Sequence, residues 1–242
     1  MSLLIALALA AAARDYCPER PGLGTPACTI EAGHLSVETS VADWTIDRGA
    51  DTVLIGDTLL RLGLSNRLEA QLGWTPLGFS GGRSGVGDVT LALKANLRNP
   101  DGSGFSAALL PFVTAPAGGG AIGAGDWAAG LVVPVGVDLG HGLSLQLTGE
   151  VDAAVDQDRH GRHAAVGGVI GLGAELSDAV ATAIEIGATR DDDPAGTTTE
   201  TLASLSLGWL VSDDFQLDAG VAAGLNHDSP DLQLSIGVSR RF

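Results

Sequence analysis

Hydrophobic and polar residues alternate along most of this chain with a period of two. Residues 143–152, Leu-Ser-Leu-Gln-Leu-Thr-Gly-Glu-Val-Asp, are the clearest example, because the odd positions are apolar or glycine and the even positions are polar. The same period recurs in residues 67–74 and 88–98. Successive side chains of a strand point to opposite faces, whereas a helix brings positions three or four apart together. The pattern therefore predicts strands with one apolar and one polar face.

The chain from His34 onward divides into alternating segments of the length that a membrane-spanning strand requires. Their number is even, as single-chain bacterial barrels require. We predict an all-β fold, an antiparallel up-and-down barrel that spans a membrane. Its roughly twelve strands are expected near residues 34–46, 52–64, 66–76, 86–98, 104–115, 126–139, 142–155, 163–176, 178–190, 200–212, 214–226 and 231–242.

Short and long connections alternate between these segments. The short ones are rich in turn-forming residues and fall at 65–66, 140–142, 177–178 and 212–214. The longer ones fall at 75–85, 115–125, 156–162 and 191–199. Outer-membrane barrels have short periplasmic turns and longer external loops, so both termini are expected to face the periplasm of a Gram-negative bacterium.

Composition supports a single barrel domain over residues 34–242. The 242 residues are 45% hydrophobic, with a mean hydropathy of +0.26. Beyond residue 13 no uncharged apolar run approaches the ~20 residues of a transmembrane helix. The 35 glycines also disfavour a helical bundle, because each weakens a helix interior by about 1 kcal/mol. Hydrophobicity is high but dispersed, as expected for strands that place one face in outer-membrane lipid.

The net charge of -16 excludes a basic surface that would bind nucleic acid or anionic lipid. Two interpretations of this charge remain open. It either solvates the external loops or forms an acidic vestibule that favours cations.

The N-terminus has the pattern of an export signal. Leu3 to Leu9 form an apolar stretch, small residues end at Ala13, and polar residues follow. We expect residues 1–13 to be a signal peptide cleaved after Ala13, although no basic residue precedes the apolar stretch. Asp15 and Tyr16 exclude a lipid attachment signal at Cys17. Residues 14–33 are then expected to form a periplasmic N-terminal segment.

Cys17 and Cys28 are the two cysteines of the chain. In an oxidising periplasm we expect them to form a disulfide within the N-terminal segment. Metal binding by these thiols is the weaker alternative, because no adjacent ligand pair completes a tetrahedral site. No cofactor is expected.

Aromatic residues are scarce but their positions suit a membrane barrel. They fall on the apolar face near strand ends, where interfacial girdles form. An exported soluble sandwich or lipocalin-like barrel is the alternative, but soluble strands are typically about 5–6 residues long. The external girdle is expected at Trp74 and Trp127 and the periplasmic girdle at Phe105, Trp209, Phe215 and Phe242. A terminal aromatic such as Phe242 is similar to the signal that the barrel assembly machinery recognises.

Four segments resemble one known barrel family, the outer-membrane transporter-like family named after a meta-cleavage pathway of phenol degradation. They are residues 20–28 (RPGLGTPAC), 56–61 (GDTLLR), 67–74 (RLEAQLGW) and 85–89 (GVGDV). The resemblance covers most of the mature chain. It implies a channel or transporter that passes small, often aromatic or hydrophobic, compounds across the outer membrane.

Charged residues on the polar face of each predicted strand are the candidates for lining the lumen. Asp57 and Arg61 are placed inside because a charge that faces lipid at mid-depth costs ~2–4 kcal/mol. Pairing around residues 65–66 should set Arg61 opposite Glu69 as a cross-strand ion pair. The pore-lining candidates are Glu38, Asp57, Arg61, Arg67, Glu69, Asp88, Lys94, Arg98, Glu150, Asp152, Glu175, Glu185, Asp218 and Arg241.

These charges allow two functions. They either line a path for solutes or neutralise one another in a filled lumen, which would make the chain a closed structural or adhesive barrel.

The external loops offer weak alternatives to a channel. Residues 156–163 could hold a metal, but two arginines oppose it, and 191–193 lacks a calcium-loop pattern. His227 with Asp228 is expected to be solvated. No histidine is placed beside a serine as a lipase requires, and His163 with Asp156 is the nearest approach to a barrel protease. We therefore expect no enzymatic activity and no metal.

Overall fold

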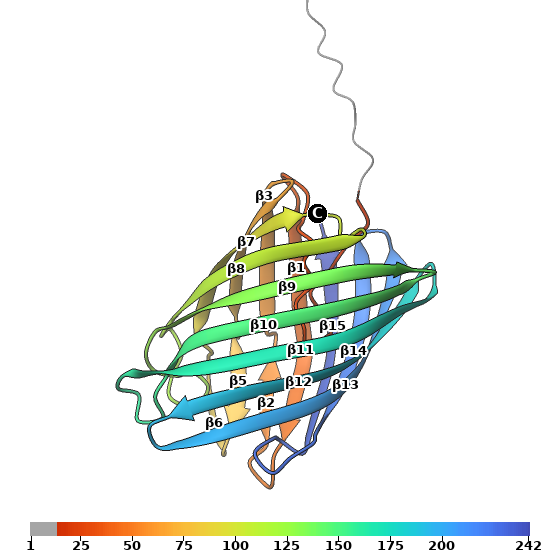
Figure 1. The fold of residues 1–242 in the computed structure, drawn as a ribbon. Helices are drawn as coiled ribbons and strands as arrows, with labels where there is room; N and C mark the ends of the chain where they lie inside the picture. Colours follow the sequence, from red (N-terminus) through yellow and green to blue (C-terminus); the bar gives the residue numbers. More distant parts are fainter. Residues whose placement is uncertain (1–13) are drawn as a thin grey trace, which may run out of the picture.

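The computed structural model describes residues 14–242, so the expected signal peptide at residues 1–13 lies outside the described residues. The described part consists of strands, turns and loops. No helix in it is long and apolar enough to cross a membrane. The strands wrap into a single tilted cylinder, and the C-terminus lies at one end of it (Figure 1).

The strands follow the predicted order closely. Each of the nine segments expected beyond residue 85 matches a single strand. Their bounds are β7 (Val89–Arg98), β8 (Phe105–Ala115), β9 (Ala128–Gly140), β10 (Leu143–Val155), β11 (Arg162–Ser177), β12 (Val180–Asp193), β13 (Gly196–Ser212), β14 (Phe215–Gly224) and β15 (Leu232–Arg241).

The first part of the chain is less regular. The strands there are β1 (Leu35–Ile46), β2 (Thr52–Ile55), β3 (Thr58–Ser65), β4 (Leu68–Trp74), β5 (Leu77–Ser80) and β6 (Arg83–Gly85). The strand expected at residues 52–64 is thus wrong as one element, because Gly56 has a positive φ of 73° and breaks it into β2 and β3. The loop expected at 75–85 is wrong too, because it contains β5 and β6, which extend the sheet from β2.

The barrel is closed by antiparallel pairing of β15 with β1, for example Val37 with Arg240. Of the fifteen strands in residues 14–242, β2, β5 and β6 lie outside this ring, which leaves the twelve that were predicted. Neighbouring strands of the ring pair antiparallel throughout, and β14 pairs with β15 in an unbroken register. The chain is therefore an all-β, twelve-stranded, up-and-down barrel.

Side chains alternate across the barrel wall as the sequence predicts. In β10, Leu143, Leu147 and Val151 are exposed on the outer surface, whereas Thr148 is buried on the inner one. A wall that is apolar outside and polar inside is typical of a barrel that lies in lipid. A soluble barrel would have the opposite arrangement, with its apolar side chains in the interior.

The wall is taller on one side. β11 has 16 residues and β13 has 17, compared with the ~9–11 residues that cross a bilayer. The loop expected at residues 191–199 is a tight hairpin, in which Asp193 pairs with Gly196. The hairpins that join these strands lie at the end of the cylinder opposite the C-terminus, the end expected to be external (Figure 1).

Candidate functional site

The N-terminal segment, residues 14–33, lies inside the barrel and not in the periplasm as expected. Tyr16 and residues 27–30 are buried. Its backbone or side chains hydrogen-bond to residues of strands from all around the ring, namely Glu38, Arg61, Glu69, Lys94, Thr148, Glu185 and Asp218. A segment outside the barrel could not reach all of these inward side chains. We call residues 16–30 the plug segment.

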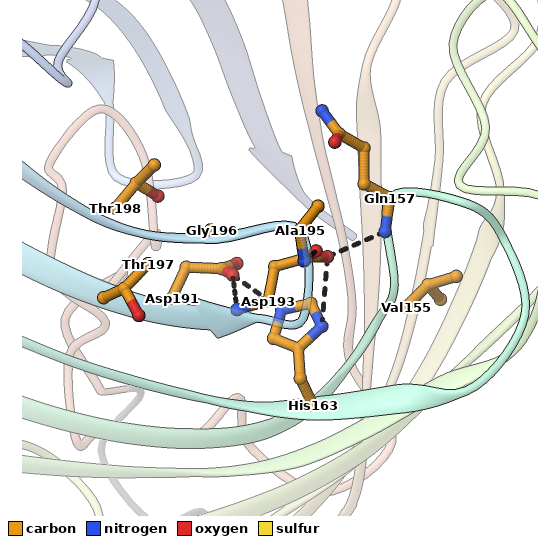
Figure 2. A pocket seen from close by; sticks show the side chains of 9 residues that line it. All are labelled: Val155, Gln157, His163, Asp191, Asp193, Ala195, Gly196, Thr197 and Thr198. Atoms are coloured by element: carbon orange, nitrogen blue, oxygen red, sulfur yellow. Dashed lines mark hydrogen bonds and ion pairs between the residues drawn. The ribbon is translucent and has the colours of Figure 1, made fainter.

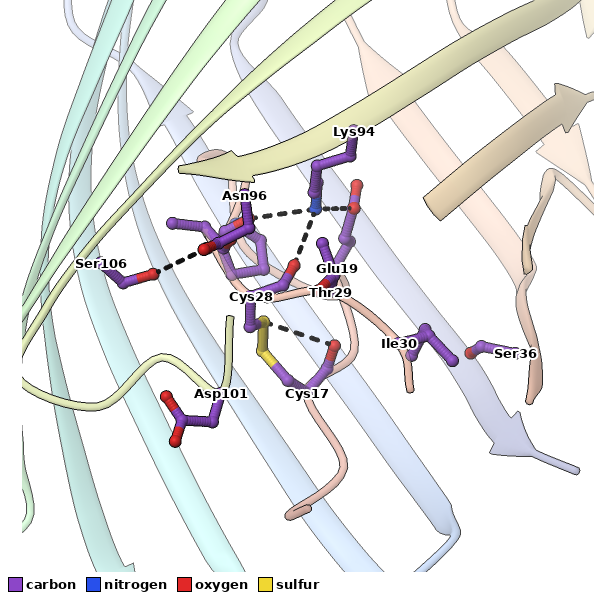
Figure 3. Close-up of a disulfide and its surroundings, with 12 residues drawn as sticks. Cys17, Glu19, Cys28, Thr29, Ile30, Ser36, Lys94, Asn96, Asp101 and Ser106 are labelled. Carbon is purple, nitrogen blue, oxygen red and sulfur yellow. Dashed lines mark hydrogen bonds and ion pairs between the residues drawn. A yellow bond between two sulfur atoms is a disulfide. The ribbon is translucent and has the colours of Figure 1, made fainter. Parts of the chain in front are cut away.

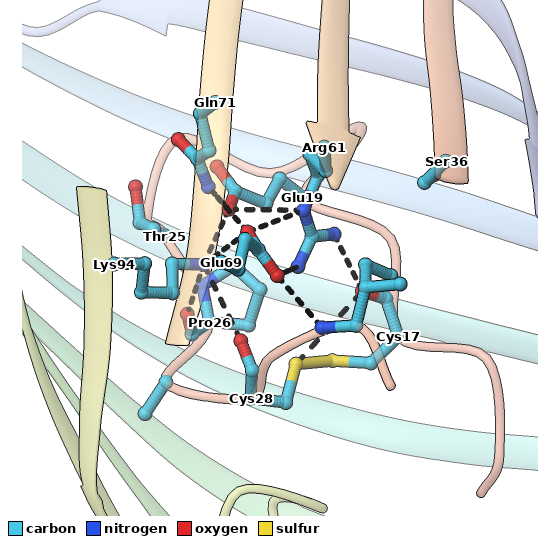
Figure 4. Close-up of polar contacts among 12 residues, drawn as sticks. Cys17, Glu19, Thr25, Pro26, Cys28, Ser36, Arg61, Glu69, Gln71 and Lys94 are labelled. Carbon is cyan, nitrogen blue, oxygen red and sulfur yellow. Dashed lines mark hydrogen bonds and ion pairs between the residues drawn. A yellow bond between two sulfur atoms is a disulfide. The ribbon is translucent and has the colours of Figure 1, made fainter. Parts of the chain in front are cut away.

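The plug segment is held first by a charged cluster on the inner wall, formed by Glu19, Glu38, Arg61, Glu69 and Lys94 (Figure 4). The Arg61 guanidinium donates to both carboxylate oxygens of Glu69, at 2.8 and 3.1 Å, and to Glu38 Oε1 at 2.8 Å. Bidentate pairs of this kind are among the strongest hydrogen bonds in proteins. Arg61, Glu38, Glu69 and Lys94 are fully buried.

The predicted Arg61–Glu69 ion pair is present, but the predicted register, with Arg61 directly opposite Glu69, is wrong. In the β3–β4 ladder Arg61 lies opposite Gln71, and Glu69 lies opposite Gly63. The pair is therefore diagonal, a distance that long side chains can bridge. Gln71 completes the arrangement by donating from Nε2 to Glu69 Oε1 at 2.6 Å.

Backbone groups of the plug segment fill the remaining hydrogen-bonding positions of this cluster. The Glu19 N–H donates to Glu38 Oε2 and the Ile30 N–H to Glu69 Oε2, each at 2.7 Å. Lys94 Nζ contacts the Glu19 carboxylate and donates to the Pro26 carbonyl at 3.1 Å. Buried charges are tolerable only when they are paired and hydrogen-bonded, so the wall and the plug segment satisfy each other.

A second attachment lies on the opposite wall. Glu185 on β12 accepts hydrogen bonds from the backbone N–H groups of Leu23 at 2.7 Å and Gly24 at 3.0 Å. Thr148 on β10 accepts from the Thr25 N–H at 3.0 Å. Gly24 has to be small, because a Cβ there would lie 3.1 Å from Thr148 Oγ1 and 3.2 Å from Glu185 Oε1. The segment thus bridges the lumen between two faces of the barrel.

The disulfide expected between Cys17 and Cys28 is present and closes the plug segment into a loop (Figure 3). The Cys17 carbonyl accepts a hydrogen bond from Arg61 at 2.8 Å. Asn96 donates to the Ala27 carbonyl at 2.7 Å. Both ends of the disulfide loop are therefore bound to the inner wall.

The pore-lining candidates fall into three groups in the structure. Glu38, Arg61, Glu69, Lys94, Glu185, Asp218 and Arg241 are buried on the inner face. Asp57, Asp88, Glu150 and Asp152 are partly buried, and the Asp88 carboxylate accepts from two backbone N–H groups of the 115–125 loop. Arg67, Arg98 and Glu175 are exposed near strand ends.

Two of the last group make contacts at the ends of strands. Arg98 lies 5.6 Å from the ring centre of Phe105, and Arg67 donates to the Leu97 carbonyl of the neighbouring strand β7. No signal in the sequence identified Glu19 or Arg20, because residues 14–33 have no periodicity.

The predicted girdle aromatics lie at strand ends. Trp74, Trp127, Phe105, Trp209 and Phe242 are exposed, and Phe215 is half-buried. Trp44 and Phe79, which the sequence analysis did not assign, are also exposed.

Two cavities border the lumen. One of about 200 Å³ lies between Pro21 and Leu23 of the plug segment and the wall around Asp43, Ser204 and Gln233. The other, of about 430 Å³, lies among the external ends of β10 to β13 (Figure 2). Within residues 14–242 no hydrogen bond joins a histidine to a serine, the pairing that a lipase would use.

The architecture is similar to that of solved outer-membrane barrels. The crystal structure of the COG4313 outer membrane channel from Pseudomonas putida F1 has a TM-score of 0.70 and 18% identity, over 92% of this chain and 99% of that one. The KdgM porin in complex with disordered oligogalacturonate has a TM-score of 0.60 and 8% identity, over 86% of this chain and 99% of the porin. No curated protein sequence matches this chain.

These likenesses concern the fold, and they agree with the closed twelve-stranded ring and the lipid-facing wall described above. The chain is an outer-membrane β-barrel of the kind found in Gram-negative bacteria. Residues 19–242, which include the plug segment from Glu19 onward and the whole barrel, match one family. This chain accordingly belongs to the family described as "Putative MetA-pathway of phenol degradation".

Proposed function

We propose that this chain is an outer-membrane channel for small compounds in which the plug segment controls the width of the lumen. The observation that supports this proposal most directly is the chemistry of the interior. A segment of the chain crosses the lumen and is held to the charged side chains of the wall by hydrogen bonds and ion pairs. Polar contacts of this kind can exchange with water, so the segment can move without leaving the wall charges unsolvated.

Small aromatic or hydrophobic compounds are the solutes that we propose. The family name points to phenol degradation, and the cavity beside Leu23 and Pro21 measures about 200 Å³. Engineered cavities of ~150 Å³ bind benzene, so the space beside the plug segment is of the right size for one aromatic ring. We also propose that the barrel assembly machinery recognises Phe242, which is exposed at the end of the last strand.

Single-channel conductance in planar bilayers tests the channel proposal against a closed structural barrel. We compare the wild type with Gly24→Val, in which the added side chain meets Thr148 and Glu185 and should displace the plug segment. The variant is expected to conduct several times more than the wild type. The matched control is Gly149→Val, because no atom lies within 4 Å of a Cβ at Gly149.

Background conductance from folded wild type and folded Gly24→Val alike would rule out the channel and favour the closed barrel. The solute class needs a separate measurement. Uptake by a deletion strain and by the complemented strain is compared on a panel of aromatic and aliphatic compounds. Equal uptake of every aromatic compound by both strains would contradict the proposed solutes while leaving the channel intact.

A further inference from the structure

A histidine surrounded by carboxylates lies at the external mouth of the barrel, far from the plug segment. His163 on β11 has a side chain that is only 6% exposed. Its Nδ1 lies 2.9 Å from Asp156 Oδ1 and 3.4 Å from Asp193 Oδ2, and its Nε2 lies 2.6 Å from Asp191 Oδ1 (Figure 2). One imidazole is thus in contact with three carboxylates from the ends of β10 and β12.

The neighbouring arginines do not neutralise this group. Arg162 pairs with Asp126 at 3.0 Å and stacks over Trp127, and Arg159 donates to the Gly120 carbonyl. The sequence analysis expected these two arginines to oppose cation binding. Since the structure directs both away, the negative charge around His163 is left for another cation.

The groups around the imidazole resemble the outer contacts of a metal site. His163 Nε2 is buried without an aligned hydrogen-bond partner and lies 2.6 Å from Asp191 Oδ1, so this nitrogen faces a carboxylate while Nδ1 faces Asp156 and Asp193. The Asp193 carboxylate is fixed by backbone N–H groups of Gln157 at 2.7 Å and Ala195 at 2.6 Å. Ligating carboxylates are commonly oriented by such second contacts, and ligating imidazoles commonly point their other nitrogen at a carboxylate.

The distances fit a small divalent ion. Around tetrahedral zinc, with bonds of ~2.0–2.2 Å, ligand atoms lie roughly 3.4 Å apart. The distance from Nδ1 to Asp193 Oδ2, 3.4 Å, equals that separation, and the distance from Nδ1 to Asp156 Oδ1, 2.9 Å, is shorter and would lengthen slightly around an ion. One ligand atom from each of Asp156, His163 and Asp193 lies within 4.8 Å of the others.

We propose that Asp156, His163 and Asp193 bind a divalent transition-metal ion such as Zn²⁺, with Asp191 orienting the imidazole. Imidazole with carboxylates is a ligand set for such ions. His163, Asp191 and Asp193 line the 430 Å³ cavity, so water or a solute oxygen from that cavity could complete the coordination. A bound ion would join the external ends of β10, β11 and β12.

Zinc binding by the purified full-length chain in detergent tests this site. After treatment with a chelator, the wild type is titrated with Zn²⁺ alone in competition with a zinc-binding dye. We expect one ion per chain, bound with micromolar or tighter affinity. His163→Ala and Asp193→Asn should each weaken binding at least about tenfold.

His160→Ala is the matched control, because His160 lies in the same loop, is exposed and contacts only the backbone of Asp158 through its ring. It should bind zinc as the wild type does. Folding of each variant is checked by its heat-modifiable mobility in gels, and Asp156→Asn replaces any variant that fails. Equal zinc affinity of the wild type, His163→Ala and Asp156→Asn would overturn the proposal, as would an equal loss in His160→Ala.

Discussion

At the scale of single residues, the barrel depends on a few buried charges. Arg61 is fully buried and contacts Glu38, Glu69 and the Cys17 carbonyl. Taking charges out of water is costly, and the cost is offset only where geometry and hydrogen bonding are good. The wall charges and the backbone of the plug segment together meet that condition, so these residues should be sensitive to substitution.

Arg61→Met removes the cation and leaves Glu38 and Glu69 buried without it. Removing one partner of a buried pair typically costs about 3–5 kcal/mol, so we expect a lower free energy of unfolding by that order. Urea unfolding in detergent or lipid measures it. Arg190→Met is the control, because the exposed Arg190–Asp192 pair should contribute at most about 1 kcal/mol. Equal unfolding midpoints for the two variants would refute this role of Arg61.

At the scale of elements, the strands follow from alternation and the connections follow from turn chemistry. β15 shows this well, because Leu234, Ile236 and Phe242 face outward while Ser239 and Arg241 are buried. Phe242 follows β15 and continues its alternation, and the Phe242 N–H and carbonyl both hydrogen-bond to the backbone of Leu35. Phe242 thus lies at the seam where the barrel closes.

Phe242→Ala tests whether the terminal aromatic guides assembly. Its ring is 60% exposed, so its loss removes little packing inside the folded barrel. We expect a several-fold lower yield of assembled protein in outer-membrane fractions, with a nearly unchanged unfolding midpoint of the protein that does assemble. Phe105→Ala, at another outward-facing periplasmic aromatic, should assemble normally. Equal yields of the two variants would contradict the proposed recognition of Phe242.

The sequence predicts the strands better than the interior. In residues 143–152 the alternation of polar and apolar residues is enough to predict which side chains face inward and which face outward. The plug segment carries no such pattern, and its partners are remote, as in the bond from Leu23 to Glu185, 162 positions away. Periodicity is a local signal, so it could place Glu185 inside but could not reveal what Glu185 binds.

At the scale of the whole molecule, the barrel and the plug segment are two parts with different kinds of stability. The barrel is closed by ladders on both sides of every strand of the twelve-stranded ring, whereas residues 14–33 contain no strand or helix. The plug segment depends on the wall charges and on one disulfide between Cys17 and Cys28. Segments with few regular hydrogen bonds open at lower free energy than the rest of a fold.

Cys17→Ser/Cys28→Ser should therefore loosen the plug segment and leave the barrel intact. In the chain-entropy account a disulfide that closes a loop of this length contributes about 3 kcal/mol, and here that constraint acts on the plug segment. We expect hydrogen exchange at the amides of Leu23, Gly24 and Ile30 to speed up at least tenfold. Exchange in β10 and β11 should stay unchanged, because their ladders do not involve the disulfide. Equal acceleration in the plug segment and in these strands would mean that the disulfide stabilises the whole barrel, and no acceleration anywhere would mean that the wall contacts alone hold the segment.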